Sequence, residues 1–154
     1  MTDKIVYKTK LTENQKGIYF ESLYEKDIEG SVSNYNLSAS FLIKGNLDVG
    51  LFEKAVRYLI DRHSALRVSV IQEDGIPLQA LHADVSFSLD YRDLSGEEEQ
   101  EKNRILSDEL RRNFVTPFDI SRAPLIRLLL LKKYDQEYLA LICCLYRCYQ
   151  PINS

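Results

Sequence analysis

The residues best suited to acid–base chemistry lie in the stretch DRHSALRVSV, residues 61 to 70. His63 could act there as a general base, because the side chain of histidine titrates near neutral pH. It could also serve, with Arg62, as a cation at the C-terminal end of a helix, facing the negative end of the helix dipole. The sequence offers no nucleophile or orienting carboxylate at a recognisable spacing from His63. From this stretch alone we favour the structural interpretation.

A second candidate site is the cysteine-rich segment LICCLYRCYQPINS. The three cysteines of the chain could bind zinc together with either of its two histidines. These residues are Cys143, Cys144, Cys148, His63 and His82. However, adjacent residues of a strand point to opposite faces, and the usual two-residue gap between cysteine ligands is missing. We therefore expect free thiols and no metal site, and the singly scattered glycines predict no phosphate-binding loop.

Length and composition predict one domain of ordinary size. The chain has 154 residues, of which 45% are hydrophobic, enough to bury a single core. Its 20 Lys and Arg and 23 Asp and Glu give a net charge of −3 with both signs mixed, so nucleic-acid binding is unsupported. No apolar run reaches the ~18 residues needed to cross a bilayer, and the charged start MTDKIVYKTK is unlike a signal peptide. We expect a cytoplasmic protein without nucleic-acid or membrane partners.

Two helices are expected in the first half of the chain. Thr12 and Gln15 form a capping box, in which each side chain can satisfy a backbone donor of the first helical turn. Asp48 is suited to cap a second helix over residues 47–63. An apolar stripe in that segment recurs at helical spacing and should face a core. Its members are Phe52, Ala55, Val56, Leu59 and Ile60.

A third helix is expected after residue 94. Ser95 and Glu98 repeat the capping-box pattern and should open it. Its apolar face would carry Leu106, Leu110 and Phe114. Pro117 should stop this helix, because proline cannot continue the helical hydrogen bonding.

Apolar and alternating runs predict the strands of one sheet. They lie at residues 34–45, 66–70, 77–82, 87–94, 124–135 and 137–145. Asp74-Gly75 provides turn chemistry for a hairpin between the second and third of these segments. The expected fold class is α/β (α+β), with a mixed or mostly antiparallel sheet covered by helices.

Together these motifs resemble the leading part of a condensation domain of nonribosomal peptide synthetases, the enzymes that join carrier-bound acyl groups into peptides. LTENQKGIYF is similar to that family's opening motif, although Gly17 stands where an arginine is usual. RHSALRVSV is similar to RHExLRxxF and departs from it at Ser64 and Val70. TPFDISRAPLIRLLLL is a third matching segment, and the resemblance spans residues 11 to about 144. The three motifs are carried by Thr12, Gln15, Tyr19, Arg62, His63, Leu66, Arg67, Phe118, Asp119, Pro124 and Arg127.

The resemblance implies a fold like that of chloramphenicol acetyltransferase, with two similar lobes and an active-site tunnel between them. Phosphopantetheine arms of carrier proteins would enter the tunnel from opposite ends, so no cofactor is bound directly. This chain would form most of the first lobe. In the family, the catalytic motif HHxxxDG follows the strand that here reads EYLALICC. Its second histidine is held to assist attack of the acceptor amine on the donor thioester.

The sequence departs from the family where the catalytic motif should begin. Leu145 and Tyr146 stand in place of the two histidines. Neither Tyr146 nor Arg147 can replace an imidazole, because tyrosine ionises near pH ~10 and arginine above ~12. His63 is no substitute, since the resemblance implies that its motif supports the fold.

We therefore expect a partial condensation domain over residues 1–154, truncated before HHxxxDG, with a non-family tail at 145–154. Such a fragment is expected to be inactive alone. Two alternatives remain, a non-catalytic module that docks a carrier protein or another synthetase subunit, and one half of a split enzyme. The resemblance implies that Arg62 pairs with the aspartate of HHxxxDG. The unpaired charge and the exposed lobe interface then predict marginal stability or self-association.

Overall fold

The computed structural model describes residues 4–26, 33 and 35–145. Within these ranges the helices are α1 (Glu13–Lys26), α2 (Val49–Arg62) and α3 (Glu99–Val115), with one turn of 3-10 helix at Ser64–Arg67. The strands there are β1 (Ile5–Lys10), β2 (Asn36–Lys44), β3 (Val68–Glu73), β4 (Ile76–His82), β5 (Asp90–Asp93), β6 (Ile126–Tyr134) and β7 (Glu137–Leu145).

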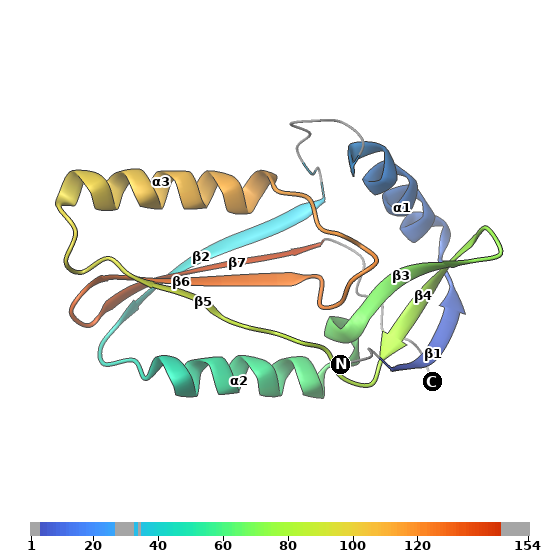
Figure 1. The fold of residues 1–154 in the computed structure, drawn as a ribbon, viewed down its shortest axis with the longest axis horizontal. Coiled ribbons are helices and arrows are strands. Elements are labelled where there is room, and N and C mark those ends of the chain that lie inside the picture. Colours follow the sequence, from blue (N-terminus) through green and yellow to red (C-terminus); the bar gives the residue numbers. More distant parts are fainter. Residues whose placement is uncertain (1–3, 27–32, 34, 146–154) are drawn as a thin grey trace.

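The strands form two sheets (Figure 1). The larger has the order β2-β7-β6-β5 and the smaller the order β1-β4-β3. Neighbouring strands are antiparallel except β5 and β6, which run parallel. This arrangement confirms the predicted α/β (α+β) fold class, but the expectation of one sheet is wrong, because the β3–β4 hairpin pairs with β1 and forms a second sheet. β1 is not among the strands predicted from the sequence. Its apolar residues Val6 and Tyr7 are adjacent and do not alternate with polar residues, and both side chains are exposed.

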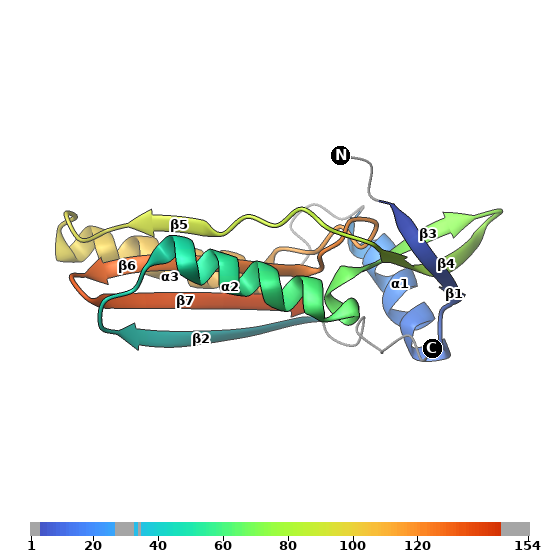
Figure 2. The same ribbon diagram turned by 90° about the horizontal axis from the view of Figure 1, so that it is seen from below.

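Helices α2 and α3 cover opposite faces of the larger sheet (Figures 1 and 2). Leu130 of β6 is fully buried in a cluster that includes Phe52 of α2. Its neighbour Leu131 is fully buried in a second cluster that includes Leu106 of α3. Side chains alternate along a strand, so the leucine run of β6 fills both layers at once.

Only part of the predicted apolar stripe of α2 is covered. Ile60 is buried, and Phe52 and Val56 are half-buried against the same side of the sheet. Leu59 is 49% exposed, and Ala55 is exposed as well. The expectation of one continuous buried stripe is therefore wrong for Ala55 and Leu59, which lie on a flank of the helix that the sheet does not cover.

The first predicted capping box is present and the second is not. Thr12 N donates to Gln15 Oε1 (2.9 Å) and Gln15 N to Thr12 Oγ1 (3.3 Å). By contrast, the Ser95 hydroxyl donates to Asp93 Oδ1 (2.6 Å), and α3 starts behind Glu98 without a side-chain cap. The second prediction is wrong because a carboxylate two residues upstream captures the serine in a local turn.

Asp48 caps α2 as predicted, since its Oδ1 accepts a hydrogen bond from Leu51 N (2.9 Å). Asp48→Ala removes this acceptor from the first helical turn, so we expect the free energy of unfolding to fall by about 1 kcal/mol. Urea denaturation followed by circular dichroism measures the change. Asp48→Asn keeps a capping oxygen and should retain most of the stability. Equal losses in both variants would contradict the capping role.

The hairpin of β3 and β4 is confirmed, with Asp74 and Gly75 both at positive φ (49° and 79°) in its turn. Two strand boundaries differ from the prediction. Leu66 lies in the 3-10 turn before β3, because the chain must first leave the end of α2. Phe87 and Leu89 precede β5, since both side chains pack on the α2 side of the core before pairing with β6 begins.

Candidate functional site at the end of strand β7

Helix α1 and the loop between α3 and β6, which carry two of the three sequence motifs, lie where the two sheets meet, near the C-terminal end of β7 (Figure 1). The loop between α3 and β6 joins both sheets there. Val70 N of β3 donates to Ile120 O (2.8 Å). Leu145 N of β7 donates to Leu125 O (3.2 Å). Leu145, Leu125 and Tyr19 of α1 belong to one buried cluster, so both the loop and α1 hold the end of β7.

Gln15 fastens α1 to the smaller sheet. Its Nε2 donates to Gln79 Oε1 of β4 (2.8 Å), and both side chains are buried. The Oε1 of the same amide accepts from Thr12 N in the capping box. A single side chain therefore caps the start of α1 and docks the helix, which explains why this position needs both a donor and an acceptor.

Arg67 clamps the C-terminal end of α2 to β4. Its guanidinium donates to the carbonyl oxygens of Ile60 (3.0 Å) and Asp61, and through Nε to that of His82 (3.2 Å). The carbonyls at a helix C-terminus lack partners within the helix, so Arg67 satisfies two of them. Leu66 beside it is half-buried in the core under α2.

Arg67→Met should lower the free energy of unfolding by about 1.5 kcal/mol, because the carbonyls at the end of α2 lose a charged donor. The measurement is urea denaturation, with Arg57→Met as the matched control. Arg57 is half-exposed and, among the described residues, forms an ion pair with Glu53 on the same helix, so its loss should be much smaller. A larger effect at Arg57 would refute the clamp.

Arg62 and His63 are both exposed and do not join this cluster. His63 is the C-cap of α2, with its backbone N donating to Leu59 O (3.0 Å). Arg62 donates to the Tyr58 hydroxyl (3.4 Å). Within the described part of the chain, Arg62 meets no carboxylate partner.

Arg127 organises the loop that precedes its own strand. Its guanidinium donates to the carbonyl oxygen of Thr116 (2.7 Å) at the end of α3 and lies 4.0 Å from the ring centroid of Phe118. Asp119 accepts hydrogen bonds from the backbone and hydroxyl of Ser121 (3.1 and 2.6 Å) and so shapes the next turn. Pro124 follows a cis peptide bond at the end of the loop.

A nucleophile–base contact that sequence reasoning missed lies between Ser69 Oγ and His82 Nε2 (2.8 Å). The two residues are 1% and 5% exposed, and the cavity that Ser69 borders holds only about 10 Å³. His82 Nδ1 meets no hydrogen-bond partner among the described residues, so no carboxylate orients the ring. The pair is therefore unsuited to acyl transfer. Only the hairpin brings the two residues together, and no spacing rule signals it.

Cys143 and Cys144 point to opposite faces of β7. Cys143 is fully buried, while Cys144 is half-buried, and burial raises the pKa of the Cys144 thiol. Cys148 lies outside the described residues. Across the described part of the chain, no three metal-ligating side chains come together.

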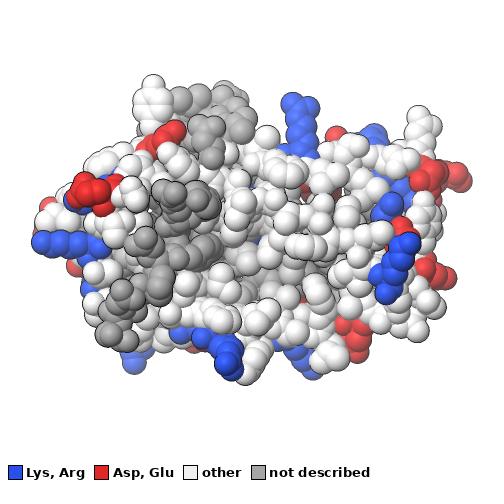
Figure 3. All heavy atoms as spheres, turned by 180° about the vertical axis from the view of Figure 1, so that it is seen from behind, with Lys and Arg blue, Asp and Glu red and all other residues white. Residues whose placement is uncertain are grey.

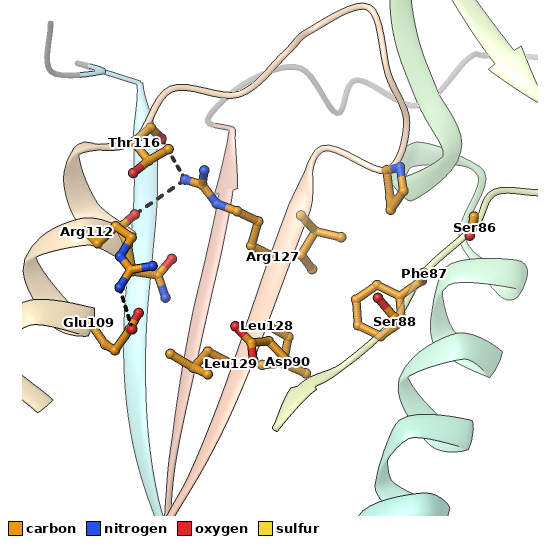
Figure 4. A pocket seen from close by; sticks show the side chains of 13 residues that line it. Ser86, Phe87, Ser88, Asp90, Glu109, Arg112, Thr116, Arg127, Leu128 and Leu129 are labelled. Carbon is orange, nitrogen blue, oxygen red and sulfur yellow. Dashed lines mark hydrogen bonds and ion pairs between the residues drawn. The ribbon is translucent and has the colours of Figure 1, made fainter. Parts of the chain in front are cut away.

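A cavity of about 380 Å³ lies beside this site, between α3, β6 and the segment before β5 (Figure 4). It opens because β5 pairs with β6 only from Asp90 onward, where Asp90 is opposite Leu129. Phe87 borders it on one side and Arg127 on the other.

Ion pairs link Glu109 at this cavity to two arginines. Glu109 is 5% exposed, and its Oε1 accepts from Arg92 (2.6 Å) and Arg112 (2.7 Å). A hydrogen bond from Arg92 to Asp90, followed by the nearby carboxylate charges, raises the pKa of Arg92 above its usual value. The cavity could hold a small ligand, but its lining contains no nucleophile–base pair.

A family model described as the condensation domain matches residues 7–144. The chain belongs to this family. One relative is bacitracin synthase 3 of Bacillus licheniformis, 34% identical over 132 residues, which are 86% of this chain and 2% of that protein. Tyrocidine synthase 3 of Brevibacillus parabrevis is 38% identical over 117 residues, again 2% of its length.

The fold is similar to that of the starter condensation domain of rhizomide synthetase RzmA. The TM-score is 0.79 at 21% sequence identity, over 91% of this chain and 34% of that chain. The chain thus corresponds to a fragment of a nonribosomal peptide synthetase condensation domain. None of the described helices is long and apolar enough to cross a membrane.

Proposed function

We propose that this chain forms the first lobe of a condensation domain and supports, but does not itself supply, the groups that catalyse amide formation. The arrangement around β7 supports this proposal, because Gln15, Arg67 and Arg127 each fasten an element near the end of that strand. In the family this strand leads into HHxxxDG, whereas residues 145–148 read LYRC and contain no imidazole. The motif residues of this chain then act as structural supports.

The reaction that such a lobe serves joins a carrier-bound acyl or aminoacyl thioester to an aminoacyl acceptor. Both substrates would arrive on phosphopantetheine arms of carrier proteins, so the lobe needs no bound cofactor of its own. The family match ends at residue 144, which supports assigning residues 145–154 to a tail outside the condensation pattern.

The direct test incubates the purified chain with donor and acceptor thioesters on carrier proteins and measures the amide by mass spectrometry. We expect no product above the enzyme-free background, with a complete condensation domain as positive control. Amide formation by the chain alone would overturn the proposal.

A split enzyme is the second candidate, and Arg62 favours it, because this side chain is exposed and pairs with no carboxylate among the described residues, so an aspartate of another chain could reach it. Mixing the chain with a separate lobe that carries HHxxxDG should then restore amide formation. Arg62→Met should reduce that restored activity. No product from the mixture rejects the split enzyme, and saturable binding of a phosphopantetheinylated carrier by the chain alone would support a docking role instead.

A further inference from the structure

We propose that two copies of this chain pair edge to edge through β2, so that their larger sheets join into one continuous sheet. This interface does not depend on the function proposed above for the lobe. It rests on four observations about β2 and its surroundings: a free edge, missing protection, apolar flanks and a self-complementary register.

The outer edge of β2 is unpaired as far as the described residues extend. β2 is the terminal strand of the larger sheet, and no other described strand pairs with its outer side. Its ladder with β7 is regular from Asn36 opposite Leu145 to Lys44 opposite Glu137, with no bulge. Figure 2 shows β2 along one margin of the sheet. A long, regular edge of this kind is a template for a further strand.

The other three sheet edges carry features that block pairing. β5 has only four residues, and three of them are charged. β1 contains Lys8 and Lys10 and has a register irregularity near Ile5. On β3, Val70 N is already used by Ile120 O. Residues 36–43 of β2 contain neither a charge nor a proline, so β2 alone among the described edges lacks protection.

Exposed apolar side chains flank this edge on both faces of the sheet. Phe41 (57% exposed) lies on the α2 face, and Leu42 (53%) lies on the α3 face. On α2, Leu89 N bonds Glu53, so that side of the helix faces β5. Leu59 lies about 120° away around the helix and therefore faces the β2 side. Figure 3, which views the molecule from behind, where β2 lies, shows a broad surface with few charges.

The edge complements itself in an antiparallel two-fold arrangement centred on Ser40. In that register Phe41 opposes Ala39 of the second copy and Leu42 opposes Ser38, so a large side chain meets a small one in each pair. Ile43 opposes Leu37 and forms an apolar pair. Lys44, the single charge of the strand, opposes Asn36 and not another lysine. A two-fold interface requires such self-complementarity, and this is the reason for choosing a second copy as the occupant.

Sedimentation velocity over a concentration series of the full chain tests the proposal. We expect a monomer–dimer equilibrium for the unmodified chain. Ser40→Lys places two like charges against each other on the two-fold axis, so the dissociation constant should rise at least ~10-fold. Gln72→Lys, at an exposed position of β3, adds the same charge elsewhere and should leave it unchanged. A chain that stays monomeric, or a dimer indifferent to Ser40→Lys, overturns the proposal.

A charge-swap experiment distinguishes loss of this interface from a folding defect as the cause of reduced association. Mixing Ser40→Lys with Ser40→Glu puts opposite charges on the axis and should restore a heterodimer. Hydrogen exchange on the unmodified chain adds an independent readout, in which amide protection of β2 should rise with protein concentration. Failure of the charge pair to restore association, or concentration-dependent protection only at another surface, would exclude pairing through β2.

Discussion

Replacing Leu130 with alanine is expected to lower the free energy of unfolding by about 3 kcal/mol. Leu130 lies in β6, one of the two inner strands of the larger sheet, and is 0% exposed. It packs with Tyr138 and Ala140 of β7, beneath Phe52 of α2. Shortening the side chain removes buried apolar surface and leaves a cavity, because strands on both sides prevent the layer from collapsing.

The measurement is urea denaturation monitored by circular dichroism, at a protein concentration that is the same for each variant. The matched control is Leu23→Ala, since Leu23 lies on α1 and is 41% exposed. Its loss should be well below that of Leu130→Ala. A similar loss at both positions would show that the layer between α2 and the larger sheet contributes no more to the free energy of unfolding than the exposed Leu23 does.

Local patterns were sufficient to predict the elements of this core. The leucine run of β6 predicts a strand buried on both faces, and the run is buried in both layers. Thr12 and Gln15 identify the start of α1, because the capping box is a contact between residues three positions apart. Each of these signals depends on residues that are close together in the sequence, so it can be recognised without the tertiary structure.

Charged residues buried by tertiary contacts could not be predicted in this way. Lys102 is 6% exposed with its ammonium 4.5 Å from the ring centroid of Tyr134, a residue 32 positions later by sequence number. Hydrophobic periodicity places such a lysine in solvent, because the pattern carries no information about what lies opposite the helix.

The same limit applies to the candidate site. RHSALRVSV contains two arginines at comparable positions, and only contacts distinguish them. Arg67 reaches the carbonyl oxygens of the preceding helix and of β4, whereas Arg62 points to solvent beside Tyr58. The segment is one of several that together resemble the family, but only the tertiary contacts show which of its two arginines holds the end of α2.

Glu109→Gln is expected to lower the free energy of unfolding by about 2 kcal/mol. The carboxylate is buried on α3 and accepts hydrogen bonds from Arg92 of the segment Asp90–Asp93 and from Arg112 on its own helix. Glutamine keeps the shape of the side chain but removes the charge, so two guanidinium groups remain beside a neutral amide. The contact joins β5 to α3, and its loss should loosen the edge of the larger sheet.

Urea denaturation measures the change, and Glu101→Gln is the matched control on the same helix. Glu101 pairs with Arg104 on the surface, where solvent screens the interaction, so its replacement should leave stability unchanged within error. Amide hydrogen exchange should also accelerate in β5 and in the facing half of α3 in Glu109→Gln alone. If both variants unfold at the same urea concentration as the unmodified chain, the buried carboxylate does not hold β5 against α3.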